Sequence, residues 1–309
     1  MREDIKQLYD EIDRALIGRG ETVRRCIIAL IGGGHILLED LPGVGKTTLS
    51  KAVAAAAGLK TKRVQFTPDT LPGDITGFMM WDAEKREFRF REGAVMTNIL
   101  LADEINRTSP RTQSALLQAM EEGCVSEEGI TAELEKPFMV IATQNPLGAA
   151  GTMPLPHSQL DRFMMKLSPG LPSREELKEM VLTRAGGSPI IRTVFDKERV
   201  LAAREGAARV GISEAAADWI AELIAATHSD GRISQGASPR AALSLAAAAR
   251  ASAYIDGREY VLPADIADIF ADCIAHRIVL SGSAARSGLN ERAVCGKLLK
   301  AVPPPHIRR

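Results

Sequence analysis

The sequence has no excess of charge of either sign, because 39 Lys and Arg residues balance 39 Asp and Glu residues. A neutral chain has no overall field that would draw it onto nucleic acid or an anionic membrane. Cysteine is scarce, and the four residues lie far apart without a CxxC pair: Cys26, Cys124, Cys273 and Cys295. This spacing argues against a zinc site or a disulfide framework. We interpret them as buried or free thiols of a reducing compartment.

Long apolar runs are missing too, since none approaches the roughly 20 residues of a membrane-spanning helix. The first residues, MREDIKQLYDEID, are charged and helical in pattern, whereas a secretory signal is apolar. We therefore expect a cytoplasmic protein without membrane insertion. A length of 309 residues predicts about two domains.

What the chain does contain is an alternation of short apolar runs with helical patterns. Two amphipathic helices, separated by a break at 17–21, precede the first strand. Five strands are predicted, at 35–39, 62–66, 98–104, 138–143 and 163–167. Helices at 46–57 and 110–122 lie between them. Such alternation predicts an α/β fold with a five-stranded parallel sheet covered on both faces.

Two segments interrupt this alternation, and a third region departs from it. Residues 73–93 and 122–137 are rich in turn residues and period-2 alternation, which predicts a hairpin inserted at each place. Beyond about residue 172 the strands stop, and amphipathic segments follow one another. We therefore predict a core domain at 1–172 and an all-helical domain with a C-terminal tail at 173–309.

The strongest chemical signal is LLEDLPGVGKTTLSKAVA at 37–54, an apolar strand that runs through a Gly-containing loop into a helix. Gly43 and Gly45 let backbone N–H groups turn toward phosphates, and Lys46 reaches the β and γ oxygens. Thr47 supplies a hydroxyl ligand for Mg²⁺. The full loop pattern begins with Gly, and this chain has Asp40 there. A chance glycine-rich turn before a helix is the alternative.

A second signal is NILLADEINR at 98–107, an apolar strand that ends in two acids. Asp103 is placed to meet the water shell of Mg²⁺, and Glu104 to act as a general base toward the attacking water. The alternative is that both acids cap the following helix. In VIATQNP at 140–146, Asn145 is placed to reach the γ-phosphate or the water, although Asn-Pro after a strand is also an ordinary turn.

Six ordered segments give the chain a family resemblance. LPGVGKTTL, FTPDTLPGDITG, LLADEINRTSPRTQSALLQAMEEG, FMVIATQNP, LPHSQLDRFMMKL and GASPRAALSL together resemble the MoxR group of AAA+ ATPases across nearly the whole chain. The resemblance implies an αβα P-loop core followed by a helical lid domain. It also implies ATP and Mg²⁺ as cofactors and a ring of subunits, usually a hexamer.

The resemblance also assigns roles to residues. It gives the Walker A role to Lys46 and Thr47, whose loop and helix start contribute Gly43, Val44, Gly45 and Thr48 to nucleotide binding. It makes Asp103 and Glu104 the Walker B pair and Asn145 sensor 1.

Four more residues receive roles from the resemblance. Arg162, in LDRF, matches the arginine finger that enters the neighbouring subunit's site. Arg240, in GASPRA, matches sensor 2, which reaches the γ-phosphate from above. Ile17 and Gly18 would lie against the adenine. From the residues alone, a salt bridge of Arg162 with Asp161 or a neighbouring acid is the favoured interpretation, because exposed ion pairs are common. Only the resemblance favours the arginine finger.

The sequence thus predicts an ATP-hydrolysing AAA+ motor that remodels a partner protein. The resemblance suggests clients with von Willebrand factor A domains and a chaperone-like role. One rival is a nucleic-acid motor, against which the neutral charge and the absence of basic blocks with interleaved aromatics argue. Another is a nucleotide-gated scaffold that barely turns over, against which the presence of Glu104 and Arg162 counts.

Overall fold

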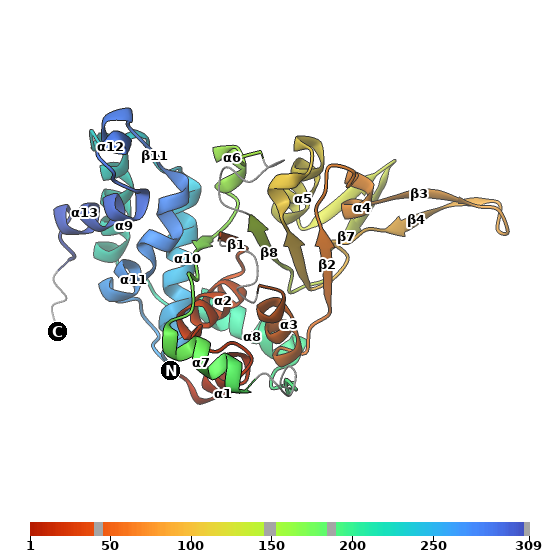
Figure 1. Ribbon diagram of the computed structural model, residues 1–309, viewed down its shortest axis with the longest axis horizontal. Helices are drawn as coiled ribbons and strands as arrows, with labels where there is room; N and C mark the ends of the chain where they lie inside the picture. Colours follow the sequence, from red (N-terminus) through yellow and green to blue (C-terminus); the bar gives the residue numbers. More distant parts are fainter. Residues whose placement is uncertain (40–45, 145–152, 184–189, 306–309) are drawn as a thin grey trace.

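The architecture is organised around one parallel sheet (Figure 1). The structure, a computed structural model, describes residues 1–39, 46–144, 153–183 and 190–305. Its five-stranded sheet has the order β2-β5-β8-β1-β9, and all four pairings are parallel. The strands are β1 (Ile36–Glu39), β2 (Thr61–Gln65), β5 (Ile99–Asp103), β8 (Met139–Gln144) and β9 (Met165–Leu167). The predicted fold class is therefore confirmed.

The central strands are apolar on both faces. Along β1, Leu37 packs into the cluster on one side of the sheet, and Ile36 and Leu38 pack into the cluster on the other. Strands β5 and β8 alternate in the same way. Because successive side chains of a strand point to opposite faces, near-continuous apolar runs are what a sheet covered on both faces requires.

Helices cover the two faces from different parts of the chain. The cluster on one face contains α1 (Glu3–Asp13), α2 (Gly20–Gly32) and α3 (Lys46–Ala56). The cluster on the other contains side chains of α4 (Pro72–Thr76) and α5 (Pro110–Glu122), and α6 (His157–Leu160) packs against it.

Local signals fix both ends of α5. The Ser109 side chain accepts a hydrogen bond from the Thr112 N–H, and Pro110 occupies the first turn. Gly123 ends the helix in the left-handed conformation, with φ of 66°. The helix therefore spans 110–122, as the sequence predicts.

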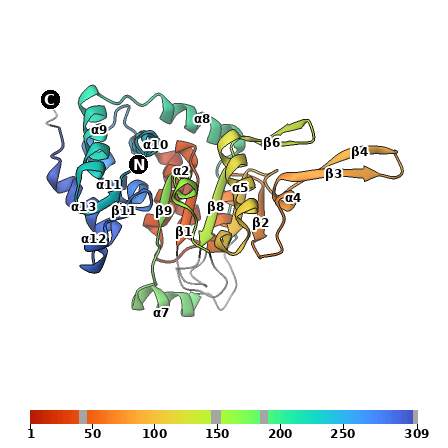
Figure 2. The ribbon, with the colours of Figure 1, turned by 90° about the horizontal axis from the view of Figure 1, so that it is seen from above.

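Both interrupting segments contain antiparallel hairpins that project from the body on the same side (Figures 1 and 2). Within 73–93, β3 (Gly77–Asp82) pairs with β4 (Glu87–Glu92). Within 122–137, β6 (Cys124–Glu127) pairs with β7 (Ile130–Glu133). The β3–β4 hairpin extends far beyond the sheet (Figure 1).

Seven α-helices are described after β9, counted over 168–183 and 190–305. They are α7 (Arg174–Thr183), α8 (Lys197–Ala208), α9 (Glu214–Ser229), α10 (Pro239–Ile255), α11 (Pro263–Ile274), α12 (Gly282–Arg286) and α13 (Glu291–Ala301). The region is helical but not all-helical, because β10 (Ile233–Gln235) pairs antiparallel with β11 (Val279–Leu280). The expectation that strands stop at 172 was therefore wrong. Strands of two and three residues are too short to show a period-2 pattern.

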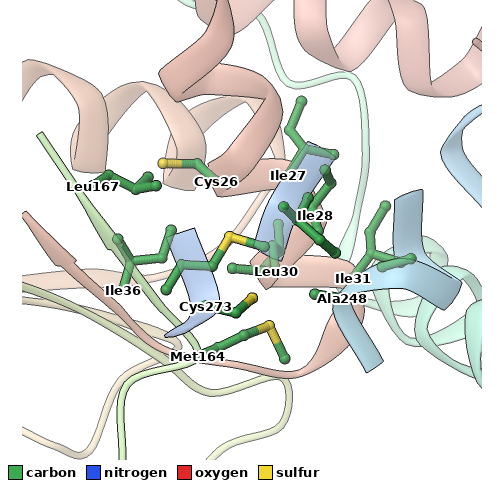
Figure 3. Close-up of a cluster of buried hydrophobic side chains, with 14 of the residues drawn as sticks. Cys26, Ile27, Ile28, Leu30, Ile31, Ile36, Met164, Leu167, Ala248 and Cys273 are labelled. Carbon is green, nitrogen blue, oxygen red and sulfur yellow. The ribbon is translucent and has the colours of Figure 1, made fainter. Parts of the chain in front are cut away.

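The helical region and the sheet share one buried cluster. Figure 3 shows α2 side chains such as Ile27 and Leu30 close to Ile36 of β1, Ala248 of α10 and Cys273 of α11. All five side chains are at most 1% exposed. The predicted boundary at residue 172 stays a prediction, since helices on both sides of it contribute to this core.

Two buried histidines make the stability of this core depend on pH. The His35 ring accepts a hydrogen bond from the Val140 N–H through Nδ1 and donates through Nε2 to the Met120 carbonyl, over 3.0 and 3.2 Å. The His276 Nε2 donates to the Phe163 carbonyl over 3.0 Å. Burial lowers the pKa of His35 to about 4 and holds the pKa of His276 well below its usual value.

We expect the free energy of unfolding to fall between pH 7 and pH 5.5. The unfolded histidines take up protons near pH 6.5, whereas the folded ones stay neutral at pH 5.5, so protons favour unfolding in this window. Each should contribute about 1 kcal/mol over this range. Urea unfolding at the two pH values measures the difference, and His35→Gln should reduce it by about half. Equal stability at both pH values would contradict this assignment.

Candidate active site

The described Walker A and Walker B residues lie at one edge of the sheet, where the parallel strands end. Asp103 is the last residue of β5, and Glu104 follows it directly beside the end of β8. Lys46 and Thr47 begin α3, which follows β1. Because carboxyl ends of parallel strands lie at the same edge, phosphate-binding and acidic residues face one region. Gly43, Val44 and Gly45, as well as Asp40 and Asn145, lie outside the described residues.

A buried threonine joins the two acids. The Thr143 hydroxyl donates to Asp103 Oδ1 over 2.6 Å and accepts from the Glu104 N–H over 2.8 Å. Thr143 is fully buried near the end of β8. Glu104 has a left-handed backbone, with φ of 57° and ψ of 49°. Such a conformation costs a non-glycine residue about 1–3 kcal/mol, so its hydrogen bond to Thr143 helps to hold it.

Two arginines contact the same acids. The Arg63 Nη2 lies 2.7 Å from Asp103 Oδ2, and the Arg107 Nη1 lies 2.7 Å from Glu104 Oε2. The carboxylates of Asp103 and Glu104 are 15% and 21% exposed, so both remain open to a ligand. Arg63 is missed by sequence reasoning because it lies within an ordinary strand pattern.

The expected adenine region lies beside Lys46 but is closed. Leu16, Arg19 and Pro169 line a space of about 10 Å³ next to Lys46, which is too small for more than one water. The Arg19 guanidinium donates to the Pro169 and Gly170 carbonyls and so holds this segment shut. Ile17 and Gly18 belong to the same turn.

Gly18 is exposed, with a φ of +72°. A Cβ there would lie 2.0 Å from the Glu176 side chain of α7. An adenine beside Gly18 therefore requires at least the Glu176 side chain to move.

Arg162 and Arg240 lie at the opposite edge of the sheet. Arg162 precedes β9 and Arg240 lies in the first turn of α10, and both pair with Glu121 at the end of α5. The His35 ring, just before β1, hydrogen-bonds Met120 beside Glu121, which places the group at the amino ends of the strands. The length of β1, about 13 Å, separates it from Lys46.

The positions of Arg162 and Arg240 bear on the roles expected of these two residues. Arg162 pairs with Glu121, while Asp161 pairs with Arg277 over 2.8 Å. Arg240 does not reach the Lys46 side of its own chain, although the resemblance put it above the γ-phosphate. Within the chain, the anionic partner of Arg240 is Glu121.

The residues at the carboxyl edge suit a magnesium nucleotide. Mg²⁺ prefers oxygen ligands and keeps several waters, so it needs few protein donors. Thr47 supplies a half-buried hydroxyl group at a helix start, and Asp103 a carboxylate oriented by Thr143. The amino end of α3 favours phosphate because its N–H groups are unpaired within the helix.

Comparisons with known proteins identify the family. A model described as the ATPase family associated with various cellular activities (AAA) matches residues 35–165, and one for an AAA lid domain matches 225–295. The YeaC protein of Bacillus subtilis is 41% identical, over 98% of this chain and 97% of its own. The chaperone MoxR1 of Mycobacterium tuberculosis is 37% identical, over 96% and 81%. The chain belongs to the MoxR family of AAA+ ATPases.

A solved structure supports the assignment of this chain to the MoxR family. The crystal structure of a Cytophaga hutchinsonii protein described as a candidate ATPase superposes with a TM-score of 0.90 at 37% identity. The match covers 98% of this chain and 95% of that one. AAA family membership implies nucleotide binding and, in general, ATP hydrolysis. None of the helices within the described ranges is long and apolar enough to cross a membrane.

We expect Thr143→Val to reduce ATP turnover about 100-fold, because a small misplacement of catalytic groups has an effect of that size. Val fills the same space but neither donates to Asp103 nor accepts from the Glu104 N–H. Thr143→Ser keeps the hydroxyl and should restore most of the rate. The test is the steady-state rate with the Mg²⁺ concentration varied. Equal rates for the Val and Ser variants would show that the hydroxyl does not position the acids.

Proposed function

We propose that this chain is a Mg²⁺-dependent ATPase whose sites are each completed by two subunits of a ring, as in a hexamer. The observation that carries the proposal is the separation of functional residues between two edges of one sheet. Lys46 and Glu104 lie at the carboxyl edge, and Arg162 and Arg240 lie at the amino edge. A head-to-tail contact would bring the two sets together on one nucleotide.

Each residue then has a defined task. Lys46 binds the β and γ oxygens, and Glu104 takes the proton of the attacking water. Arg162 and Arg240 of the neighbour meet negative charge that spreads over the transferred phosphoryl group, an effect worth about 10³- to 10⁵-fold in rate. Mg²⁺ held by Thr47 and Asp103 would neutralise charge on the phosphate oxygens.

We further propose that hydrolysis remodels a partner protein, in the first instance one with a von Willebrand factor A domain, in the cytoplasm. An exposed apolar set on the β3–β4 hairpin supports a protein partner, since exposed apolar patches mark interaction sites. Its members are 41–63% exposed: Phe78, Met80, Trp81 and Phe88. A nucleic-acid motor is not favoured, because the Holliday junction subunit RuvB of Picosynechococcus matches only 42% of this chain.

Glu104→Gln should bind ATP normally and hydrolyse it at least ~100-fold more slowly, because Gln cannot accept the proton of the water. Calorimetry with ATP and Mg²⁺ measures binding, and phosphate release measures turnover. Glu133→Gln makes the same change at an exposed acid of β7 and should behave as wild type. Turnover of Glu104→Gln near the wild-type rate would mean that the base lies elsewhere. Proteins retained by this variant with ATP would identify the client.

Mixing inactive variants tests which subunit each arginine serves. Arg162→Ala should bind ATP and lose about 10³-fold or more in turnover, because it acts on charge developed in the transition state. Lys46→Ala lacks a phosphate site but keeps both arginines. Mixed rings should therefore regain activity, as measured by phosphate release. An inactive mixture that demonstrably co-assembles would contradict a role for Arg162 in the neighbouring site.

The same mixing design separates the two possible roles of Arg240. If Arg240 serves the neighbour, Arg240→Ala regains activity with Lys46→Ala and stays inactive with Arg162→Ala. If Arg240 serves its own site, the two outcomes are reversed. We expect the first pattern, because Arg240 lies beside Arg162 and across the sheet from Lys46.

A further inference from the structure

Glu121 binds both interface arginines with one carboxylate. Its Oε2 lies 2.5 Å from Arg162 Nη1, and its Oε1 contacts Arg240 Nη2. Arg162 also donates to the Leu117 carbonyl over 2.8 Å, so α5 supplies both of its acceptors. A single anionic group therefore orients two guanidinium groups from two different elements.

This group lines a pocket at the surface. The pocket has a volume of about 300 Å³, and Glu121, Arg162, Arg240 and Ser244 contribute to its wall. The two arginine side chains are 29% and 40% exposed, so an anion from outside can approach them. The volume and the paired guanidinium groups suit phosphate oxygens, which arginine binds through two parallel hydrogen bonds.

We propose that Glu121 is a stand-in anion that the terminal phosphate of the neighbouring subunit's ATP displaces. This inference rests on the proposed function, in which Arg162 and Arg240 serve that neighbour. Glu121 holds the arginines in their docking orientation when no triphosphate is present. A phosphate group carries more negative charge than one carboxylate and offers more acceptor oxygens, so it takes both arginines from Glu121.

The exchange is physically easy. Ion pairs between partly exposed groups contribute little to stability, so breaking them costs little. Glu121 also repels an incoming phosphate while it remains in the pocket. The carboxylate therefore weakens docking of any neighbouring subunit. The effect is largest when that neighbour holds ADP, because no terminal phosphate is present to displace Glu121. Glu121 thus makes assembly with ATP more favourable than assembly with ADP.

Glu121→Gln removes both the competing anion and its repulsion. In the Glu104→Gln background, which holds ATP, assembly should occur at about five-fold lower protein concentration than with Glu121 intact, the effect of one unit charge at about 4 Å in water. Assembly with ADP should gain more than assembly with ATP, so that the difference between the two protein concentrations needed for assembly becomes smaller. Sedimentation velocity on the full chain measures both.

Glu122→Gln is the matched control, because it makes the same change at the next residue, which contacts Gln118. It should leave unchanged the protein concentrations at which half of the protein is assembled, with ATP and with ADP (the assembly midpoints). Weaker assembly of Glu121→Gln, or midpoints equal to those of Glu122→Gln, would overturn the stand-in role. If Arg162→Ala keeps wild-type turnover, the proposed function itself fails. If Arg162→Ala is inactive while Glu121→Gln matches its control, only this inference fails.

Discussion

The amino edge of the sheet, where Arg162 and Arg240 lie, depends on one buried guanidinium group. Arg277, in the short helix η3 (Ala275–Arg277), is 1% exposed as a side chain and pairs with Asp161 over 2.8 Å. It also donates to the Phe163 carbonyl and to the Ser244 hydroxyl over 2.8 and 3.0 Å. An arginine cannot shed its charge, although burial lowers its pKa, so it must keep these acceptors.

These bonds explain why two distant arginines lie together. Asp161 directly precedes Arg162, and Ser244 lies one turn along α10 from Arg240. Through these bonds, Arg277 connects the segment that precedes β9 to the first turns of α10. Breaking a buried charge pair by removing one partner costs about 3–5 kcal/mol, so this junction resists independent movement of the two segments.

Helix α5 connects the two edges. In its first turn, the Gln113 amide donates to the Ile105 carbonyl, immediately after Glu104, and its last turn carries Glu121. A helix of 13 residues spans about 20 Å and moves as a unit. This helix therefore connects the segment after Glu104 to the carboxylate that binds Arg162 and Arg240.

The sequence predicted what depends on local pattern. Short apolar runs between helical patterns located the five strands, and Ser109, Pro110 and Gly123 set the ends of α5. The sequence predicts Lys46, Thr47, Asp103 and Glu104 as site residues because each task needs a particular side chain at a fixed spacing. Thr143 and Glu121 were missed, because their importance comes from contacts 40 or more residues away along the chain. The β10–β11 pair was missed because it is too short to show a pattern.

The two arginines and the phosphate-binding residues lie at opposite ends of the strands, and this arrangement restricts the symmetry of an assembly. A two-fold dimer joins the arginine edge of each subunit to the phosphate edge of the other only if both edges lie within one self-complementary patch. A head-to-tail contact between two different patches has no such requirement, and it repeats in one direction. An open row of such subunits always leaves one terminal site without arginines. Among such head-to-tail assemblies, only a closed ring gives every nucleotide site the two arginines of a neighbour. Because every contact runs head to tail, the ring also has a direction in which hydrolysis can pass from one subunit to the next.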